Sequence, residues 1–394
     1  NHKEDYKMNF EESDRLKSLP PYLFAEIDKI INKKREEGLD VISLGIGDPD
    51  IPTPEGIVDV LCKEASNPEN HRYPSSYGLK IFKEAVAKFY YDRFNVELNP
   101  DREVIPLMGS KEGISTIAYT FINPGDYAII TDPSYLVYRI GTIFAGAEPY
   151  TLPLRRENDY LFDLNSIDNN IADKAKILYF NYPNNPTSAT CDIDFFNRIV
   201  SFAGKNNIIV CHDNAYSDIY IGGEKPISFL NADVSKNTGI ELNSLSKTFN
   251  MTGWRIGYAV GNQEMIKSIG KYKTNVDSGV FNAVQYAAAK ALNNYDKYTE
   301  HNNKIYEARR LMVKEALDSM GIDYYDSNAT IYVWASVPEG YTSASFSKML
   351  LEKANVVVTP GSAFGKFGEG FFRISLTIIS ERLKEALDRI GNIL

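Results

Sequence analysis

The chain has 394 residues, which is long enough for one large or two medium-sized domains with well-buried cores. Its formal net charge is −9 and it has no long run of Lys or Arg, which argues against nucleic-acid binding as the main function. Three cysteines without a C-x-x-C pair and four scattered histidines argue against a disulfide framework and structural zinc, so no metal is expected. The three cysteines leave one unpaired in any disulfide scheme, and reduced thiols in a cytoplasmic protein fit best. The sequence has no apolar run long enough to span a membrane, and residues 1–7 lack the apolar core of a signal peptide.

The N-terminal part of the chain predicts a helix followed by a short strand. Apolar residues recur at helical spacing over residues 22–37, and Gly38 is placed to end that helix. A strand over residues 41–44 leads into residues 45–50, where two glycines permit either a tight turn or a close approach of the backbone to a ligand. Further on we expect a loop and a helix over residues 51–71, a loop over 73–78 and a helix over 79–94.

From about residue 104, strand-like and helical patterns alternate, which is typical of a largely parallel α/β sheet. Polar clusters follow the C-terminal ends of the predicted strands. Because open α/β sheets bind ligands in the crevice outside those ends, we expect the polar clusters to meet in one site. The strands are predicted at residues 104–107, 127–131, 177–180, 208–211 and 240–242, with a further strand, interpreted as antiparallel, at 254–260.

The C-terminal part of the chain predicts long helices over residues 263–320 and then a smaller mixed region, with strands at residues 331–336, 356–359 and 372–376 and a helix at 344–354. Ser380 is expected to cap the last helix. The predicted fold class is α/β, with a mostly parallel central sheet and helices on both faces in a large domain, plus a smaller α+β domain. The predicted boundaries are an N-terminal arm with part of the small domain at residues 1–48, the large domain at 49–290 and the small C-terminal domain at 291–394.

Lys247 is the residue around which we predict a catalytic site. It closely follows the strand at residues 240–242, within Ser244-Leu245-Ser246-Lys247, and is expected on a loop at the end of that strand. A lysine placed there forms an imine readily if its ammonium group loses a proton near neutral pH. A solvated loop lysine is the commoner interpretation when this residue is considered alone.

Pyridoxal phosphate is a cofactor that combines a lysine imine with a phosphate and a pyridine nitrogen. Asp213 ends an apolar strand, where a pyridinium nitrogen would provide the cation that a buried carboxylate needs. A helix N-cap is the alternative interpretation of this aspartate. Asn185 and Tyr216 are placed to bond the ring's phenolic oxygen, which would lower the pKa of the imine, whereas ordinary Asn-Pro turn chemistry is the alternative for Asn185.

Several residues are candidates for anion binding at the two ends of such a ligand. Gly109-Ser110 opens a helix, and free amides at a helix N-terminus suit a phosphate. Arg373 is a cation inside an apolar strand, where it needs an anionic partner. That partner is expected to be either the α-carboxylate of a substrate or an acidic residue of the protein in an internal salt bridge. Tyr135 is placed to stack on the cofactor ring, although a core aromatic is the commoner role for such a residue. Hydroxyl and guanidinium donors for the phosphate are available from Ser244, Ser246 and Arg255.

These pieces, in this order and spacing, resemble the class I/II aminotransferases, fold type I enzymes that bind pyridoxal phosphate. The likeness extends from about residue 22 to the C-terminus. Ser188 departs from it, since the family usually has glycine there, and we expect altered loop detail with retained catalysis. The segments that carry the resemblance are residues 45–49, Tyr73, 109–111, Tyr135, 185–187, 213–216, 244–247, Arg255 and Arg373.

The resemblance implies a role for each matching residue. Lys247 would be the Schiff-base lysine and the proton shuttle, Asp213 would keep the ring nitrogen protonated, and Tyr216 with Asn185 would hold the ring oxygen. Tyr73 would reach the phosphate from a partner subunit, which implies a homodimer with shared active sites. The remaining implied cofactor contacts are Ser110, Lys111, Tyr135, Ser244, Ser246 and Arg255. The implied substrate contacts are Tyr22, Gly47, Lys111, Tyr135, Asn185 and Arg373.

Several segments are similar to the branch of this family that transaminates LL-diaminopimelate, among them residues 19–24, 70–75, 210–213 and 275–281. That likeness implies amino transfer between LL-diaminopimelate and 2-oxoglutarate, in the synthesis of lysine and cell-wall precursors. One alternative is an aminotransferase of the same family for alanine, aspartate or an aromatic amino acid. A second alternative is a fold type I lyase or decarboxylase. A third is a non-catalytic amine-sensing regulator, although the sequence shows no attached DNA-binding segment.

Overall fold

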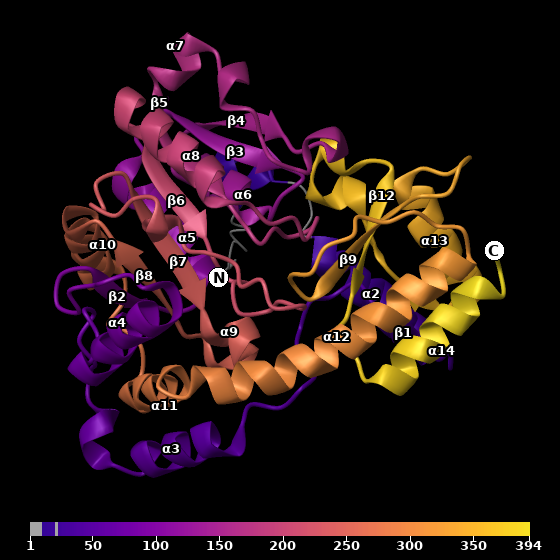
Figure 1. Cartoon of the computed structure of the whole chain (residues 1–394), viewed down its shortest axis with the longest axis horizontal. Coiled ribbons are helices and arrows are strands. Elements are labelled where there is room, and N and C mark those ends of the chain that lie inside the picture. Colours follow the sequence, from indigo (N-terminus) through magenta and orange to yellow (C-terminus); the bar gives the residue numbers. More distant parts are fainter. Residues whose placement is uncertain (1–9, 20–22) are drawn as a thin grey trace, which may run out of the picture.

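A central seven-stranded sheet forms the largest layer of the molecule, with helices packed on both of its faces (Figure 1). The structure is a computed structural model that describes residues 10–19 and 23–394, with side chains in the first long helix described from residue 29 onward. The strand order is β2-β8-β7-β6-β5-β3-β4. The strands of this sheet are β2 (Val104–Leu107), β3 (Tyr127–Asp132), β4 (Glu148–Pro153), β5 (Ala175–Phe180), β6 (Ile209–Asp213), β7 (Gly239–Ser244) and β8 (Gly257–Gly261).

Both faces of this sheet are buried. Strands β3 to β7 run parallel to one another, whereas β8 runs antiparallel to both β2 and β7. Along β5, Leu178 and Phe180 belong to one apolar cluster, and Ile177 and Tyr179 belong to another. Because successive side chains of a strand point to opposite faces, these two clusters lie on the two sides of the sheet. This burial explains why the parallel strands are continuous apolar runs rather than alternating ones.

Different helices cover the two faces. The helices α5 (Ser110–Phe121), α6 (Val137–Phe144) and α10 (Gln263–Val276) contribute to the cluster that contains Ile177. The helices α3 (Glu55–Ala65), α4 (Lys80–Phe94), α8 (Ile193–Asn206) and α11 (Asn282–Leu292) contribute to the cluster that contains Leu178. In the part of the chain that the structure describes, helices with the length and apolar character needed to cross a membrane are absent.

A smaller group of strands and helices lies beside the large sheet (Figure 1). An antiparallel sheet has the order β11-β12-β9, and β1 pairs in parallel with β10. Four of these strands, β1, β9, β10 and β12, share an apolar cluster with three helices. Nearby, Ile31 packs on Val41 and Val357. The division of the chain at residues 48 and 290 stays a prediction. The strands of this group are β1 (Ile42–Ser43), β9 (Tyr332–Ser336), β10 (Val356–Val357), β11 (Thr359–Pro360) and β12 (Phe371–Ser375). Its helices are α2 (Leu23–Glu36), α12 (Tyr295–Ser319), α13 (Ser343–Ala354) and α14 (Ser380–Gly391). Short helices elsewhere in the chain are α1 (Asp14–Lys17), α7 (Asn169–Ala172) and α9 (Leu245–Thr248).

Most predicted strands occur where expected, with ends that differ by one or two residues. The strand expected at residues 254–260 is antiparallel, as predicted, but begins at Gly257. The chain forms a single 3₁₀ turn just before it, and Arg255 has a left-handed φ of +53°. The strand expected at residues 356–359 divides into β10 and β11, which belong to different sheets. Strand β4 was not predicted, because it lies at an edge of the sheet where most of its side chains are only partly buried.

The two predicted helix ends have different outcomes. Gly38 has a φ of +81°, and the amides of Gly38 and Leu39 donate back to carbonyls of the last turn of α2, so the predicted C-cap is confirmed. Ser380 was wrongly predicted as a cap. Ile379 is the N-cap residue of α14 and makes no side-chain bond to the helix, so Ser380 is instead the first helical residue.

Candidate active site

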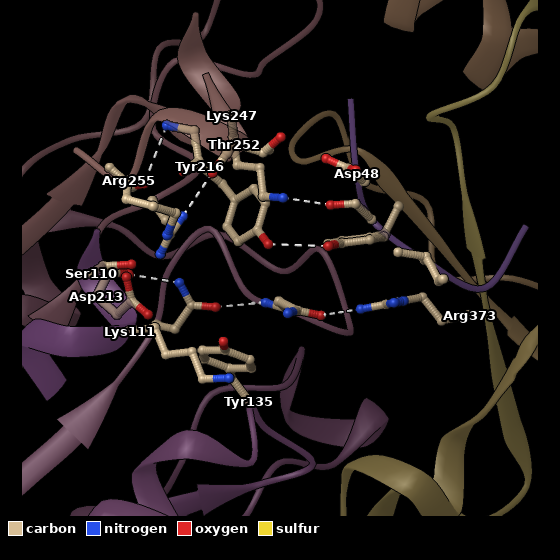
Figure 2. A pocket seen from close by; sticks show the side chains of 18 residues that line it. Asp48, Ser110, Lys111, Tyr135, Asp213, Tyr216, Lys247, Thr252, Arg255 and Arg373 are labelled. Carbon is tan, nitrogen blue, oxygen red and sulfur yellow. Dashed lines mark hydrogen bonds between the residues drawn. The ribbon is translucent and has the colours of Figure 1, made fainter. Parts of the chain in front are cut away.

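A cavity of about 380 Å³ is lined by the C-terminal ends of parallel strands of the large sheet together with residues of the smaller group. Every predicted site residue except Tyr22 and Tyr73 lines this cavity (Figure 2). Tyr22 lies outside the described residues, and Tyr73 is 90% exposed. The lining residues are Ile46, Gly47, Asp48, Ser110, Lys111, Tyr135, Asn181, Asn185, Asp213, Ala215, Tyr216, Ser244, Ser246, Lys247, Thr252, Arg255, Tyr332 and Arg373.

Asp213 is a buried carboxylate at the end of β6, and only 5% of it is exposed. Its Oδ2 atom accepts a hydrogen bond of 2.8 Å from the hydroxyl of Tyr138, whereas its Oδ1 atom has no hydrogen-bond partner among the described residues. Burial raises the pKa of Asp213 to about 6, although the Tyr138 hydroxyl and the neighbouring His212 act in the opposite direction. The Oδ1 atom is therefore available to a cationic N–H group of a ligand.

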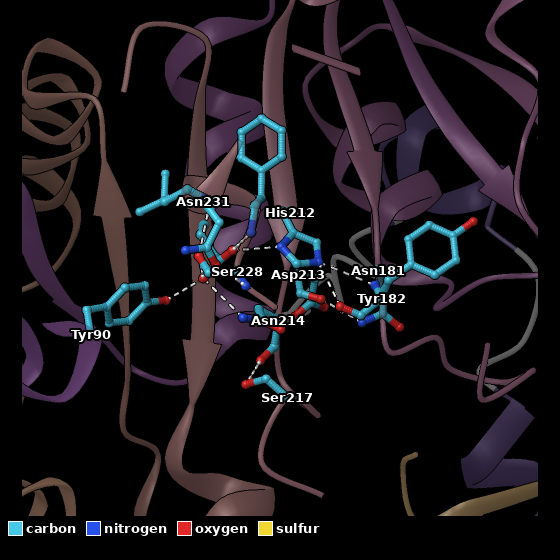
Figure 3. A network of polar contacts seen from close by, with 12 residues as sticks. Tyr90, Asn181, Tyr182, His212, Asp213, Asn214, Ser217, Ser228 and Asn231 are labelled. Carbon is cyan, nitrogen blue, oxygen red and sulfur yellow. Dashed lines mark hydrogen bonds and ion pairs between the residues drawn. The ribbon is translucent and has the colours of Figure 1, made fainter. Parts of the chain in front are cut away.

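A buried polar network holds the strand ends beside Asp213 (Figure 3). Its centre is Glu241 on β7, which accepts hydrogen bonds from His212 at 2.8 Å, Asn214 at 3.0 Å and Tyr90 at 2.6 Å. Burial alone would raise the pKa of Glu241, but the hydrogen bonds and charge of His212 and the bonds from Tyr90 and Ser228 lower it below its usual value. Since His212 and Asn214 flank Asp213 in the chain, their bonds to Glu241 fix the backbone from which the Asp213 carboxylate projects.

A chain of hydrogen bonds crosses the cavity from Asp213 to Arg373. The side-chain amide of Asn181 donates to the carbonyl of Asp213 at 2.6 Å, and the backbone amide of Asn185 donates to Asn181 Oδ1 at 2.6 Å. The Oδ1 atom of Asn185 then accepts a bond of 2.7 Å from Arg373 Nη1. The chain thus links the large sheet to β12 of the smaller sheet through the floor of the site.

Lys247 lies on α9, a single helical turn directly after β7. The expected loop was therefore wrong, because the side chain of Ser244 caps this turn by accepting from the amide of Ser246. The Lys247 amine donates to the carbonyl of Gly47. Burial lowers the pKa of Lys247, and the nearby cations of Arg373 and Arg255 lower it further, while Tyr332 and Asp48 act in the opposite direction. A lowered pKa favours the unprotonated amine that imine chemistry requires.

Donors suited to a phosphate gather at one end of the cavity. Ser110 is the first residue of α5, and Gly109 at its N-cap has a φ of +84°. The backbone angle favours glycine, and a Cβ atom on Gly109 would lie 2.4 Å from Arg255 Nη2 and would displace that guanidinium. Ser244, Ser246 and Arg255 line the same cavity. Hydroxyl groups, a guanidinium and a helix N-terminus together form a suitable anion site.

Arg373 lies at the other side of the cavity and is 1% exposed. Its guanidinium carbon is 4.0 Å from the centre of the Tyr332 ring and 4.7 Å from that of Phe364. Its Nη2 atom donates to the carbonyl of Gly45 at 2.7 Å. A buried cation positioned by ring faces and neutral oxygen acceptors is suited to a carboxylate ligand.

Sequence reasoning missed several residues that line the cavity or support it. Tyr332 was not singled out because it begins an apolar strand, and its place beside Arg373 depends on the pairing of β9 with β12. Tyr138 was missed because it reaches Asp213 from α6, which the sequence did not predict. Asn181 gave a usable signal, because it directly follows β5 at the strand end where ligand-binding residues were expected.

The residues of the cavity fit pyridoxal phosphate. Asp213 offers a buried carboxylate oxygen that lacks a hydrogen-bond partner among the described residues. Lys247 offers an amine with a lowered pKa, and the N-terminus of α5 with its neighbouring hydroxyls offers an anion site. These are the three features that the ring nitrogen, the aldehyde carbon and the phosphate of the cofactor need.

Comparison with known proteins gives the family. The family model described as aminotransferase class I and II matches residues 39–390. The chain belongs to the class I and II aminotransferases. This aminotransferase is 54% identical to the LL-diaminopimelate aminotransferase of Aquifex aeolicus over 98% of this chain and 99% of the relative. It is 50% identical to the LL-diaminopimelate aminotransferase of Moorella thermoacetica over 98% of each chain.

Solved structures agree with this assignment. The substrate-bound structure of BacF from Bacillus subtilis matches this aminotransferase with a TM-score of 0.93 and 39% identity over 98% of each chain. The predicted fold type I class, the pyridoxal phosphate cofactor and the aminotransferase reaction on amino acids and oxo acids are therefore confirmed.

The raised pKa of Asp213 predicts that cofactor affinity depends on pH. Below about pH 6 this carboxyl is increasingly protonated in the cofactor-free protein and loses the charge that attracts the pyridinium N–H. We expect the dissociation constant for pyridoxal phosphate, measured by fluorescence quenching, to rise by up to about tenfold per pH unit below pH 6. The cofactor phosphate also titrates, so Asp213→Asn, which has no charge to lose, is the control. Equal pH slopes in the two proteins would contradict the prediction.

Proposed function

We propose that this aminotransferase exchanges an amino group between LL-diaminopimelate and 2-oxoglutarate. The observation that carries the proposal is the identity of 54% and 50% to two LL-diaminopimelate aminotransferases over nearly the full chain. The cavity supports it, because the side chains of the family pattern gather there around one buried space. Such a reaction would serve the synthesis of lysine and cell-wall precursors.

In this proposal the central residues handle the proton of the substrate. Bound pyridoxal phosphate supplies an electron sink that stabilises negative charge at the substrate's α-carbon. Asp213 has an unbonded Oδ1 atom that would accept the N–H of the cofactor ring, and its charge would keep that nitrogen cationic. Lys247 would hold the cofactor covalently through its amine. Once a substrate amine takes that place, the freed amine of Lys247 would act as the base that accepts the substrate's α-proton and as the acid that gives the proton back. The lowered pKa of Lys247 leaves more of this amine unprotonated and able to act as a base.

The remaining residues orient the cofactor and the substrate. Tyr216 and Asn185 would bond the ring oxygen, and Tyr135 would stack on the ring. Arg373 binds the substrate's α-carboxylate, with Gly47 lining the site beside it. We assign Lys111 to both the cofactor and the substrate, because it lines the cavity next to Ser110. Tyr22 stays a predicted substrate contact. The phosphate ligands in this proposal are Ser110, Ser244, Ser246 and Arg255, with Tyr73 from a second subunit.

Discrimination among amino donors tests the substrate. With 2-oxoglutarate as acceptor and glutamate formation as the readout, we expect kcat/KM for LL-diaminopimelate to exceed that for alanine, aspartate and phenylalanine by at least about 100-fold, since buried polar groups reject donors that leave them unpaired. The meso isomer of diaminopimelate is the control for stereochemistry at the distal end. A higher kcat/KM for aspartate or an aromatic amino acid would replace the proposed substrate and leave the reaction class unchanged.

Replacement of the lysine tests its assigned role. Lys247→Ala removes the amine that binds the cofactor and moves the proton, so we expect loss of the visible absorption of the lysine-bound cofactor and a fall in kcat of at least about 10⁴-fold. Lys267→Ala is the matched control, since Lys267 is a solvent-exposed lysine of α10 that does not line the cavity. Turnover of Lys247→Ala at the wild-type rate would assign the chemistry to another amine.

We further propose a homodimer whose two active sites each receive Tyr73 from the partner subunit. Tyr73 is 90% exposed and does not line the cavity of its own chain. Its loop packs against another exposed segment, since Gly279 lies against the backbone of Ser75 and Ser76. Near that contact Val276 is 63% exposed. Exposed apolar side chains gathered on neighbouring segments support a subunit interface.

Mixed dimers test whether Tyr73 acts across the interface. Tyr73→Ala lowers cofactor affinity in the proposal, and Lys247→Ala is inactive, so each parent protein has low activity at limiting pyridoxal phosphate. A mixed dimer contains one site with both Lys247 and the other subunit's Tyr73, and we expect it to recover up to about half of the wild-type activity. If Tyr73 acted within its own subunit, mixing would restore nothing.

Cellular location is a separate proposal. The cysteines Cys62, Cys191 and Cys211 are all free thiols. Free thiols persist in a reducing compartment. We therefore propose that the enzyme works in the cytoplasm.

A further inference from the structure

Tyr332 lies between two groups to which the proposed function gives separate tasks. It is the first residue of β9, lines the cavity and is 3% exposed. Its ring faces the guanidinium of Arg373, and its hydroxyl oxygen is 3.1 Å from that of Tyr216. The Tyr332 side chain thus contacts both Arg373, which is proposed to bind the substrate's carboxylate, and Tyr216, which is proposed to donate to the ring oxygen of the cofactor.

The contact between Tyr332 and Arg373 follows from strand pairing. Arg373 on β12 is opposite Trp334 on β9, and Tyr332 is two residues from Trp334 on the same face of the sheet. This diagonal position brings the Tyr332 ring within 4.0 Å of the guanidinium carbon, with Phe364 at 4.7 Å. Both side chains are almost fully buried, and a cation–π contact is strongest where water is excluded. The ring therefore restricts the orientation in which Arg373 presents its N–H groups.

The number of available protons decides which tyrosine donates in the hydrogen bond between Tyr332 and Tyr216. A tyrosine hydroxyl has one proton to donate and two lone pairs to accept with. If Tyr216 donates its proton to the ring oxygen of the cofactor, the proton between the two tyrosines must come from Tyr332. The Tyr332 hydroxyl is also closely enclosed, because a Cβ atom on Gly47 would lie only 2.0 Å from its oxygen. Tyr332 therefore has little freedom to turn away from Tyr216.

The backbone of Tyr332 is held by the residue that departs from the family pattern. Ser188 has a left-handed φ of +65°, a conformation that favours glycine. Its hydroxyl donates to the carbonyl of Tyr332 at 3.0 Å, and the Tyr332 amide donates to the hydroxyl of Thr330 at 3.1 Å. Compared with glycine, Ser188 is less suited to this backbone angle, but its hydroxyl forms a hydrogen bond to Tyr332 that fixes the start of β9.

We propose that Tyr332 is a positioning residue with two separable contributions. Its ring holds Arg373 in the orientation that binds the substrate's α-carboxylate. Its hydroxyl donates to Tyr216, so that the proton of Tyr216 points to the ring oxygen of the cofactor. This inference rests on the roles of Arg373 and Tyr216 in the proposed function.

Two substitutions separate the ring from the hydroxyl. Tyr332→Phe keeps the ring, so we expect KM for glutamate and 2-oxoglutarate to stay within about twofold, while the pH midpoint of the cofactor's visible absorption rises by about one unit because Tyr216 donates less well. Tyr332→Leu also removes the ring face, and we expect KM for both substrates to rise by about tenfold or more. The midpoint is read by absorbance titration without turnover. The other charged groups that influence Lys247, namely Asp48, Arg255 and Arg373, are unchanged in both variants.

Tyr306→Phe is the matched control. Tyr306 is a buried tyrosine of the same apolar cluster, and its hydroxyl has no hydrogen-bond partner among the described residues. Removal of this hydroxyl is expected to leave both KM and the midpoint unchanged. If Tyr332→Leu loses the circular dichroism spectrum of the native protein, Tyr332→Met, which fills the space without a ring face, replaces it.

The possible results distinguish this inference from the proposed function. If the pH midpoint of Tyr332→Phe equals that of the wild type, the proposed role of the Tyr332 hydroxyl is overturned. If Tyr332→Leu raises KM no more than Tyr332→Phe does, the proposed role of the Tyr332 ring is overturned. Arg373→Lys is measured in parallel. If Arg373→Lys raises KM strongly and Tyr332→Leu does not, only the inference about Tyr332 fails. If neither variant raises KM, the carboxylate role of Arg373 fails with it.

Discussion

The buried carboxylate of Asp213 is the constraint on which the active site depends. A carboxylate taken out of water is costly unless hydrogen bonds or a cation stabilise its charge. The protein satisfies one oxygen with the hydroxyl of Tyr138 and leaves the other without a partner among the described residues. The result is a pKa of about 6 for Asp213, which means that the ionised carboxylate is only partly stabilised until a cationic group binds beside it. In the proposed function the ring nitrogen of the cofactor is such a group, so the burial that destabilises the charge also favours a cationic ligand.

The charges around Asp213 are arranged to match one kind of ligand. Arg255 and the start of α5 contribute positive potential at one end of the cavity, and Arg373 does so at another side. Lys247 lies among these groups, and its own burial and its cationic neighbours together lower its pKa. A molecule with a phosphate, a cationic ring and a carboxylate-bearing partner is complementary to this pattern. The cationic neighbours that would suit such a ligand are therefore the same groups that help to lower the pKa of Lys247.

Hydrogen bonds across the cavity join the two parts of the fold at the reaction site. Asn181 and Asn185 connect Asp213 with Arg373, and Lys247 contacts the segment after β1 through Gly47. Outside the cavity, Arg309 of α12 bonds Asp50 with both terminal nitrogens, at 2.7 and 2.8 Å. A change in position of the smaller strands would therefore be transmitted directly to Asn185, Asn181 and Lys247 in the cavity.

The amino-acid sequence by itself determined the local elements and the types of residue in the site. Apolar runs identified the parallel strands, because both faces of the sheet are buried. The polar residues that follow the strands predicted at residues 177–180, 208–211 and 240–242 identified the edge of the sheet at which a ligand site was expected, and residues from all three places line the cavity. The order and spacing of those polar residues were enough to indicate the family and its cofactor, and the family comparison agrees. Local patterns were less informative at strand β4 and at Ser380, where partial burial and an uncapped helix start leave a weak signal.

Only the tertiary structure decided which groups act together. Tyr138 reaches Asp213 from a helix 75 residues away in the chain, and Tyr332 reaches Tyr216 across a separation of 116 residues. The pKa values of Asp213 and Lys247 likewise follow from burial and from neighbours that are distant in sequence. The physical reason is that the spacing of apolar residues shows only which face of a helix or strand is buried. Desolvation, ring stacking and hydrogen-bond direction depend on which distant segments pack against that face. The sequence thus determined the chemistry that is present, and the packing of two sheets decided how it is positioned and how reactive it is.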